Sequence, residues 1–436
     1  MAGWSKYFFL IWMCCAFLLP ARILFAQISA LEFHGSSILE NPPVDTAGFP
    51  AVFDLRDHGR IGEAFEHPVS GCWAAAAVGS LGSVFLSEGY GFPPLSVSHL
   101  QNCHGFVPSR SYNGNHYMAT AYFVRGSGPV AKGQGSDTLC EGEFTSPVLV
   151  TEAVCLPPDP AAIKRSVLER GGVYAMMYFR KEHGWDSVSN LYYTSATKKI
   201  NHAVVITGWN DTLSVPGGHG AWIARNSLGK GFGDDGFFYI SYLDKNFLDY
   251  NAIWTEWMDR RDDLRVHYYD TLGSYYSFGF EDSVCCGLVR FTAGKDCRLA
   301  MVGTFVNNAN SSVRAGVYSR FDTATGNLSD LRYASGVRSF PYRGYFTFRL
   351  DVTVEIKAGE EFFVMVKYVS PGTDQPMPVE TYIEDYSDPH ITSKTSWVNP
   401  DIDRWPATWY ECGAESPWEN LMFDLCIKAY CVESMK

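Results

Sequence analysis

The sequence predicts an α+β domain followed by an all-β sandwich domain. Three observations carry this prediction. The apolar, alanine-rich run 72–87 follows a small-residue turn and stops before a glycine, which is typical of a buried helix. The apolar run 203–206 is typical of a strand. After about Arg265 the chain contains only strand-length apolar runs.

The second half is predicted to be a β-sandwich. The runs 345–350, 362–368 and 423–430 are short and rich in aromatic and β-branched residues, and turns such as 357–360 and 370–372 separate them. No long helical period occurs there. Strand-length runs with regular turn signals are typical of a sandwich.

The composition bounds the class of protein and its partners. The 436 residues leave room for two or three domains, and 46% hydrophobic with 19% charged residues describes a globular chain with an ample core. The net charge is −12, from 35 Lys and Arg against 47 Asp and Glu. Because no long basic block is present, nucleic acid is not expected as a partner, and neither is an anionic membrane surface.

The N-terminus predicts export. Lys6 precedes the apolar run 7–19, and residues 24–26 resemble a signal-peptide cleavage site, so residues 1–26 are read as a signal peptide. The apolar run is too short to span a bilayer comfortably, which argues against stable membrane insertion, although an uncleaved anchor is the alternative. Residues 27–51 are then a short N-terminal arm or pro-segment, and the protein is expected to be secreted or extracellular at the cell surface.

Cysteine usage fits an exported protein. Of twelve cysteines, Cys14 and Cys15 lie in the signal segment. Export permits disulfides, and some could form among Cys285, Cys286, Cys297, Cys412, Cys426 and Cys431, with a connectivity that spacing does not reveal. Because no CxxC pair is present, we expect no metal and no cofactor.

Three residues form a candidate catalytic set. Cys72 stands at a predicted helix N-terminus, where free backbone N–H groups and the helix dipole favour a thiolate. His202 follows after 202 − 72 = 130 residues and Asn226 after 226 − 72 = 154. A thiolate nucleophile, an imidazole acid/base and an amide that orients the imidazole are a known catalytic combination, in which pairing with the imidazole lowers the pKa of the thiol. A core cysteine, a core histidine and a turn asparagine are the alternatives.

The motifs around these residues resemble the papain-like cysteine proteases, peptidase family C1. The matching segments are 53–57, 71–73, 201–209 and the Asn loop with its glycine-rich hairpin, 226–236. The resemblance implies a two-lobed protease domain over 52–262, with a helical lobe and a β-barrel lobe. It also implies an endopeptidase that acts on protein or peptide substrates through a thioester acyl-enzyme, with Cys72, His202 and Asn226 as its triad.

The chain departs from the family pattern at the oxyanion hole. The family has a Gln six residues before the nucleophile, a position that is Glu66 here, with His67 as the other candidate. No Gln occurs between Asp54 and Cys72, and loss of one oxyanion donor typically costs about 100- to 1000-fold in rate. This absence is what puts turnover in question.

Three further departures concern packing and substrate binding. Leu228 stands where the family has a Trp that shields the Asn–His bond. Val69 replaces the family cysteine, so Cys103 lacks its usual partner. The substrate-binding Gly-Gly pair becomes Asn113-Gly114, and we expect Gly114 to bind the substrate backbone.

The second half resembles the C-terminal "lectin-like" domain of some papain-like proteins, over residues 265–432. Five aromatic residues gathered there could stack on sugars or fill the core: Trp397, Trp405, Trp409, Tyr410 and Trp418. The alternative function is therefore an adhesion or glycan-binding surface protein with a weakened protease domain. Transpeptidation would use the same triad.

Two patterns are set aside. Residues 231–236 match G-x-G-x-x-G, but they lead into the apolar run 237–242, which is typical of a strand, whereas a dinucleotide fingerprint opens a helix. His99, His104 and His116 fit no single helix face, so they are interpreted as loop or surface histidines and not as metal ligands.

Overall fold

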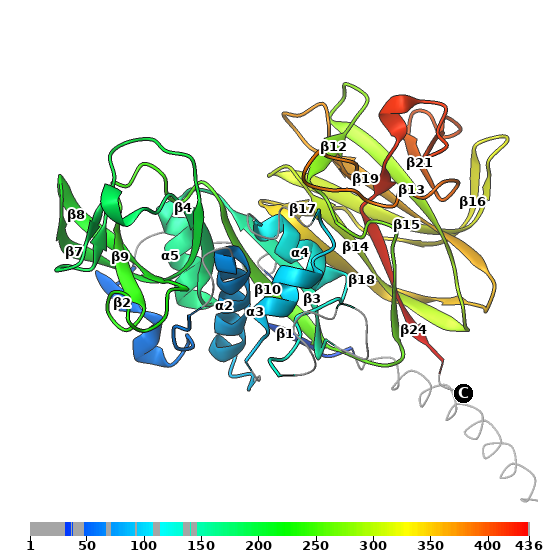
Figure 1. The fold of residues 1–436 in the computed structure, drawn as a ribbon. Helices are drawn as coiled ribbons and strands as arrows, with labels where there is room; N and C mark the ends of the chain where they lie inside the picture. Colours follow the sequence, from blue (N-terminus) through cyan, green and yellow to red (C-terminus); the bar gives the residue numbers. More distant parts are fainter. Residues whose placement is uncertain are drawn as a thin grey trace, which may run out of the picture.

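The computed structural model describes residues 31–35, 37, 48–66, 71–91, 94–107, 114–133, 140 and 146–434. Within these residues the α-helices lie in the first domain, and the second domain is built from strands (Figure 1). The predicted α+β architecture with a β-rich C-terminal domain is confirmed. The predicted signal peptide 1–26 lies outside the described residues.

Four α-helices are described, and three of them begin at side-chain caps. They are α2 (Cys72–Ser87), α3 (Val97–Cys103), α4 (His116–Val124) and α5 (Pro160–Glu169). The side chains of Ser96, Asn115 and Asp159 accept hydrogen bonds from free N–H groups of α3, α4 and α5. Helix α2 has no such cap and is almost entirely buried, so tertiary packing stabilises it. Three 3₁₀ turns complete the list: η1 (Leu55–His58), η4 (Lys181–His183) and η5 (Glu419–Leu421).

One 14-stranded sheet runs through both domains in the order β11-β24-β14-β18-β3-β10-β4-β7-β8-β9-β6-β5, with β1 and β2 attached at its sides. Its first-domain strands are β1 (Phe33–Gly35), β2 (Val52–Asp54), β3 (Val148–Leu156), β4 (Val173–Met177), β5 (Trp185–Asp186), β6 (Leu191–Tyr192), β7 (His202–Val215), β8 (Gly218–Arg225), β9 (Phe237–Ser241) and β10 (Asn251–Asp259). Helix α2 packs beside β7 and β10 (Figure 1).

The two domains join within this sheet. Strand β3 of the first domain pairs antiparallel with β18 (Arg343–Ile356) of the second, with Arg343 opposite Cys155 and Phe346 opposite Glu152. The remaining second-domain strands of this sheet are β11 (Leu264–His267), β14 (Cys297–Val306) and β24 (Ile427–Glu433). Because the junction consists of backbone hydrogen bonds, the domains are held as one body at this edge.

A second sheet covers the β14–β18 face and completes the sandwich. It has the order β16-β15-β19-β13-β21-β22, with β17 paired to β15. A hydrogen bond of 2.6 Å between Thr304 on β14 and Tyr368 on β19 joins the two layers. Its strands are β13 (Val284–Thr292), β15 (Ser311–Asp322), β16 (Asn327–Ala334), β17 (Arg338–Phe340), β19 (Glu361–Val369), β21 (Ser396–Asn399) and β22 (Tyr410–Cys412). A small third sheet contains β12 (Tyr276–Phe278), β20 (Met377–Glu380) and β23 (Asp424–Leu425).

Most predicted elements match the observed ones, and two differ in extent. The predicted helix 72–87 is α2, and the runs after His202 and at 362–368 are β7 and β19. The run 345–350 is only the first half of β18. The run 423–430 is divided at Cys426 into β23 and β24, because the two halves pair with different sheets.

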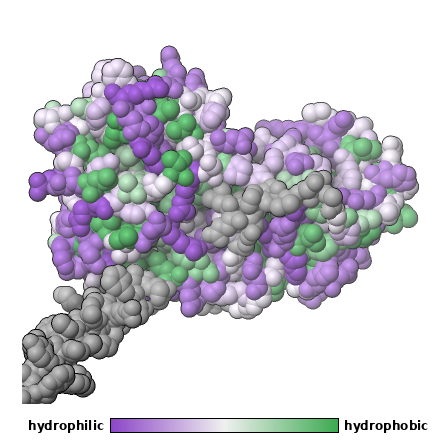
Figure 2. Space-filling model, turned by 180° about the vertical axis from the view of Figure 1, so that it is seen from behind, coloured by the Kyte–Doolittle hydropathy of each residue, from purple (hydrophilic) through white to green (hydrophobic). Residues whose placement is uncertain are grey.

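None of the described helices is long and apolar enough to cross a membrane. Seen from behind, hydrophilic residues cover both domains and hydrophobic residues occur in small separate groups (Figure 2).

Candidate active site

Cys72 is the first residue of α2 and lies against the start of β7. Its N-cap residue is Gly71, with no side-chain cap, so free backbone N–H groups surround the thiol. The sulfur also receives a hydrogen bond from the backbone N–H of Ala203, the residue after His202. The Cys72 residue is only 7% exposed. The fold thus brings the nucleophile candidate and the histidine strand together.

His202 and Asn226 are in direct contact. Nε2 of His202 lies 3.0 Å from Oδ1 of Asn226, and both side chains are buried. The same Oδ1 accepts the backbone N–H of Ser227 at 2.8 Å, which fixes the orientation of the amide. Because Oδ1 can only accept, Nε2 of the ring must carry the proton. In the neutral ring this leaves Nδ1 as the basic atom.

The electrostatics differ from the sequence-based expectation for Cys72. Burial raises the pKa of the Cys72 thiol, and the N–H groups of Ala203 and Trp73 offset this only in part. The predicted lowering of that pKa is therefore wrong. Burial also lowers the pKa of His202 to about 4, opposed by its bond to Asn226. Low polarity disfavours both charges, so thiol and imidazole rest as neutral groups at pH 7.

An aromatic cluster that the sequence analysis missed covers His202. The Phe179 ring lies 5.3 Å from the His202 ring and 5.8 Å from the Phe232 ring. The Trp185 ring stacks on the Phe232 ring at 4.5 Å. Asn201 holds Phe179 through hydrogen bonds to its backbone N–H and C=O, of 2.8 and 3.2 Å. These rings lie beside the histidine in a chain where Leu228 replaces the family Trp. The signal available in the sequence was the aromatic density of 179–193 near the histidine strand.

Glu66 is tied to the Asn loop. Its backbone forms a bridge with Leu228, and its side chain points to solvent. Buried Arg225 stabilises the preceding loop, since it donates to the Gly62 carbonyl at 3.1 Å and lies over the Phe65 ring. Glu66 is therefore near the site, but a carboxylate cannot donate a hydrogen bond to an oxyanion. His67 lies outside the described residues.

Gly114 lies against the residue that follows the nucleophile. A Cβ atom at this position would come within 2.2 Å of the Trp73 indole, so packing alone requires glycine here. Its proposed substrate-binding role stays a prediction. Its neighbour Asn113 lies outside the described residues.

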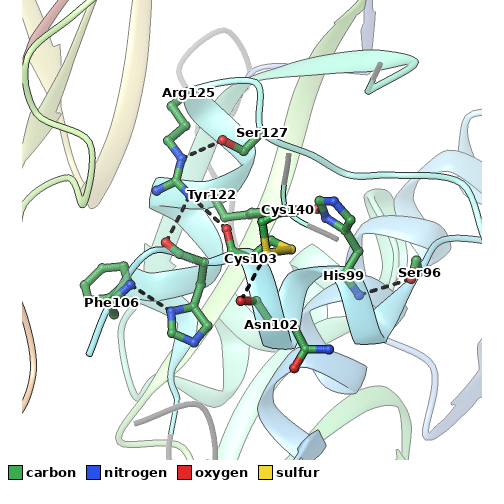
Figure 3. The surroundings of a disulfide bond; sticks show 10 residues. Ser96, His99, Asn102, Cys103, Phe106, Tyr122, Arg125, Ser127 and Cys140 are labelled. Carbon is green, nitrogen blue, oxygen red and sulfur yellow. Dashed lines mark hydrogen bonds between the residues drawn. A yellow bond between two sulfur atoms is a disulfide. The ribbon is translucent and has the colours of Figure 1, made fainter. Parts of the chain in front are cut away.

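Cys103 has a partner that the sequence did not indicate. It forms a disulfide with Cys140, whereas Val69 stands at the position of the usual family partner (Figure 3). Beside it, Arg125 donates to the carbonyls of Cys103 and His104 and to Thr271 at the start of the second domain. In the second domain, the six cysteines among which disulfides could form are free thiols in the structure.

The comparisons with known proteins divide the chain in the same way. Residues 49–252 match the family described as "Papain family cysteine protease", and residues 266–431 match "Lectin like domain". The first domain belongs to the papain family. The second is a lectin-like domain. The first domain is accordingly that of a cysteine peptidase, a hydrolase.

Two curated relatives each match half of the chain or less. Cathepsin J of Mus musculus is 27% identical over 239 residues, covering 50% of this chain and 71% of that protein. A cysteine proteinase of Trypanosoma brucei brucei is 24% identical over 213 residues, 45% of this chain and 45% of its own length.

Two solved structures match most of the chain, across both domains. Clostridial cysteine protease Cwp84 after propeptide cleavage superposes with a TM-score of 0.74 at 18% identity, covering 88% of this chain and 99% of that one. A structure of the protease and lectin-like domains of Cwp84, described as a surface layer associated protein of Clostridium difficile, gives 0.70 at 17% identity, with 93% and 91% coverage. At this identity the likeness defines the fold.

The aromatic residues proposed for sugar stacking are divided between core and surface. Trp397 is buried, and Trp409 packs against Phe321 at 5.8 Å. Trp405 and Trp418 are exposed, at 58% and 53%. Glycan binding through this domain stays a prediction, with the last two residues as its candidates.

Proposed function

We propose that the protein is a secreted or cell-surface cysteine endopeptidase that uses Cys72, His202 and Asn226. The observation that carries this proposal is the 3.0 Å contact between His202 and Asn226, on the strand whose next residue donates to the Cys72 sulfur. A histidine with a purely structural role would be satisfied by a single hydrogen-bond partner. Here the partner, Asn226, is itself oriented by the backbone N–H of Ser227, and the Cys72 thiol lies at the N-terminus of a helix.

In the first half-reaction His202 removes the proton from Cys72 through Nδ1, since Nε2 is bonded to Asn226. The sulfur attacks the substrate carbonyl carbon, and the carbonyl π electrons move onto oxygen. When the C–N bond breaks, the imidazolium gives its proton to the leaving amine and a thioester remains. In the second half-reaction Nδ1 takes a proton from water, the hydroxide attacks the thioester, and the acid and the Cys72 thiol are released.

The oxyanion requires donors where the family Gln is missing. The backbone N–H of Cys72 lies at the first position of α2, where the helix offers it no carbonyl acceptor. We assign the second donor to the His67 ring, because the Glu66 side chain is exposed and acceptor-only when ionised.

Two observations support a location outside the cell. Residues 1–26 have the pattern of a signal peptide. The fold also matches that of Cwp84, which is described as a surface layer associated protein. Substrates are then extracellular proteins or peptides.

The test is labelling with an epoxysuccinyl peptide inhibitor, followed by intact-mass analysis and peptide mapping. One adduct on Cys72 that is lost in His202→Ala supports the triad. The matched control is Cys412→Ala, which removes a free thiol on β22 of the lectin-like domain and should leave the adduct in place. Absence of an adduct on native Cys72, with normal labelling after denaturation, would contradict the proposal.

A further inference from the structure

A cavity of about 330 Å³ lies where β3 and β18 join the two domains. The protease domain contributes Tyr117, Cys155 and Tyr250 to its wall, and the lectin-like domain contributes Tyr275, Asn307 and Arg343. Neither domain forms this cavity alone. A pocket of this size admits a side chain or a small ligand.

The cavity has a cation without a counter-charge. Arg343 forms no ion pair with any described residue, and no Asp or Glu lines the wall. Arg343 is an exposed residue of the cavity wall, and its charge opposes protonation of the buried His116 and favours the ionised form of Cys155.

Phenolic hydroxyls add further donors. Those of Tyr117, Tyr250 and Tyr275 form no hydrogen bond with described residues, and Tyr117 packs edge-on against Tyr275 at 5.3 Å. Asn307 is fixed in place, since its Nδ2 donates to Ser274 and Ser277 at 2.7 and 2.9 Å. The wall thus offers one guanidinium and several O–H groups to an anionic, acceptor-rich ligand, and aromatic rings to its apolar stem.

The chain links the cavity to the candidate nucleophile. Gly114 packs so closely on Trp73, the residue after Cys72, that a Cβ atom there would lie 2.2 Å from the indole. Tyr117 of the cavity wall follows Gly114 by three residues, near the start of α4. Three residues span at most about 11 Å, so a peptide bound at Gly114 can place a neighbouring side chain at the cavity.

We propose that this interdomain cavity binds an acidic side chain of the peptide substrate, with Arg343 of the lectin-like domain as its counter-charge. This inference rests on the proposed peptidase function. A glutamate side chain has a carboxylate, which can pair with Arg343, and a methylene stem, which the tyrosine rings can cover. The second domain then takes part in selecting the peptide.

The test compares fluorogenic peptides that differ only by Glu or Gln at each position on the amino side of the cleaved bond. We expect the wild type to favour Glu by about tenfold or more in kcat/KM at one position. The Glu/Gln ratio should fall to near one in Arg343→Gln. It should persist in Arg320→Gln, a matched change of an arginine that is 78% exposed by its side chain and paired with Asp330 outside the cavity.

A binding measurement separates this inference from the peptidase proposal. Fluorescence anisotropy on Cys72→Ala should give tighter binding of the Glu peptide, and Arg343→Gln in that background should remove the difference. If no peptide is cleaved but this binding pattern holds, the cavity assignment stands and the peptidase proposal fails. Equal cleavage and equal binding of Glu and Gln peptides would overturn the cavity assignment alone. Binding of free glucuronate without any Glu-peptide preference would overturn it as well.

Discussion

The two domains bury polar groups in opposite ways. In the protease domain, His202 and Asn226 form a buried pair of neutral groups, and Cys72 beside them is a neutral thiol. In the lectin-like domain, Lys428 and Asp270 form a buried ion pair of 2.6 Å, with both side chains at most 1% exposed. The first arrangement can gain and lose a proton during a reaction, whereas in the second Lys428 opposes the rise that burial causes in the pKa of Asp270.

The Lys428–Asp270 ion pair lies beside a contact between the two domains. Asp270 lies in the segment that follows β11, and Lys428 on β24 also donates to the Asp270 backbone carbonyl at 3.0 Å. The adjacent Thr271 carbonyl accepts from Arg125 of the protease domain at 2.6 Å. The pair therefore fixes the segment after β11, which contacts the protease domain through Thr271. The buried ion pair between Lys428 and Asp270 therefore has a structural role where the domains meet. The candidate site instead buries Cys72 and His202, which can change charge.

The sharpest test of this contrast is His202→Ala. We expect kcat/KM to fall by roughly 10⁴-fold or more, because the general base is lost, with little change in the unfolding midpoint. Steady-state kinetics on a peptide substrate and urea unfolding measure the two effects. A large loss of stability at unchanged kcat/KM would instead assign His202 a structural role.

The reverse result is expected for Lys428→Met. Removal of one partner leaves Asp270 charged and buried, which costs about 3–5 kcal/mol in the free energy of unfolding. Protein that remains folded should keep its kcat/KM. Lys357→Met is the matched control: its partner Asp296 is half exposed, so it should cost less than about 1 kcal/mol. Equal costs for the two variants would show that burial of the pair is unimportant.

A third prediction concerns the acidic neighbours of the ion pair. Burial and Asp270 raise the pKa of Glu380 to about 8, while its unfolded value is 4.5. Between these values the folded state binds the extra proton, so the stability of wild type falls as pH rises. Glu380→Gln removes this loss and keeps an acceptor for the Leu272 N–H.

Glu380→Gln should therefore raise the free energy of unfolding by about 1–3 kcal/mol at pH 8, and by little at pH 5. Denaturant titrations at the two pH values measure the difference. Glu384→Gln, at an exposed position, should have no effect at either pH. A benefit of Glu380→Gln that is independent of pH would contradict the assignment.

The protease domain should respond to pH in the opposite direction. Burial and Arg343 lower the pKa of His116 to about 3. Below its unfolded value of 6.5 the unfolded chain binds a proton that the folded state does not, so stability falls as pH falls. His116→Leu should flatten this decline between pH 6.5 and 4 by on the order of 1–2 kcal/mol.

Unfolding titrations across that pH range provide the measurement. His58→Leu, at an exposed position, is the control and should leave the slope of the wild type unchanged. If His116→Leu retains the full wild-type decline, the histidine is not the source of the acid sensitivity.

Local pattern predicted the elements that hold the candidate site. The alanine-rich run that begins at Cys72 is too long for a typical strand, and it forms the expected buried helix. The run after His202 is apolar and rich in β-branched residues, which is typical of a buried strand, and 231–236 leads into β9 as a turn does. The triad candidates could be listed from spacing, because motif order along the chain survives sequence divergence.

Tertiary structure alone decided how the domains meet and what lies between them. Nothing near Cys155 or Arg343 indicates that β3 and β18 pair, since the match of two strand edges depends on side chains packed from both domains. The same holds for the Cys103–Cys140 disulfide, for Phe179 on His202, and for the pKa of Cys72, which is set by burial and not by its motif. Sequence determines local geometry over a few residues, whereas long-range pairing and desolvation emerge only when the whole chain has packed.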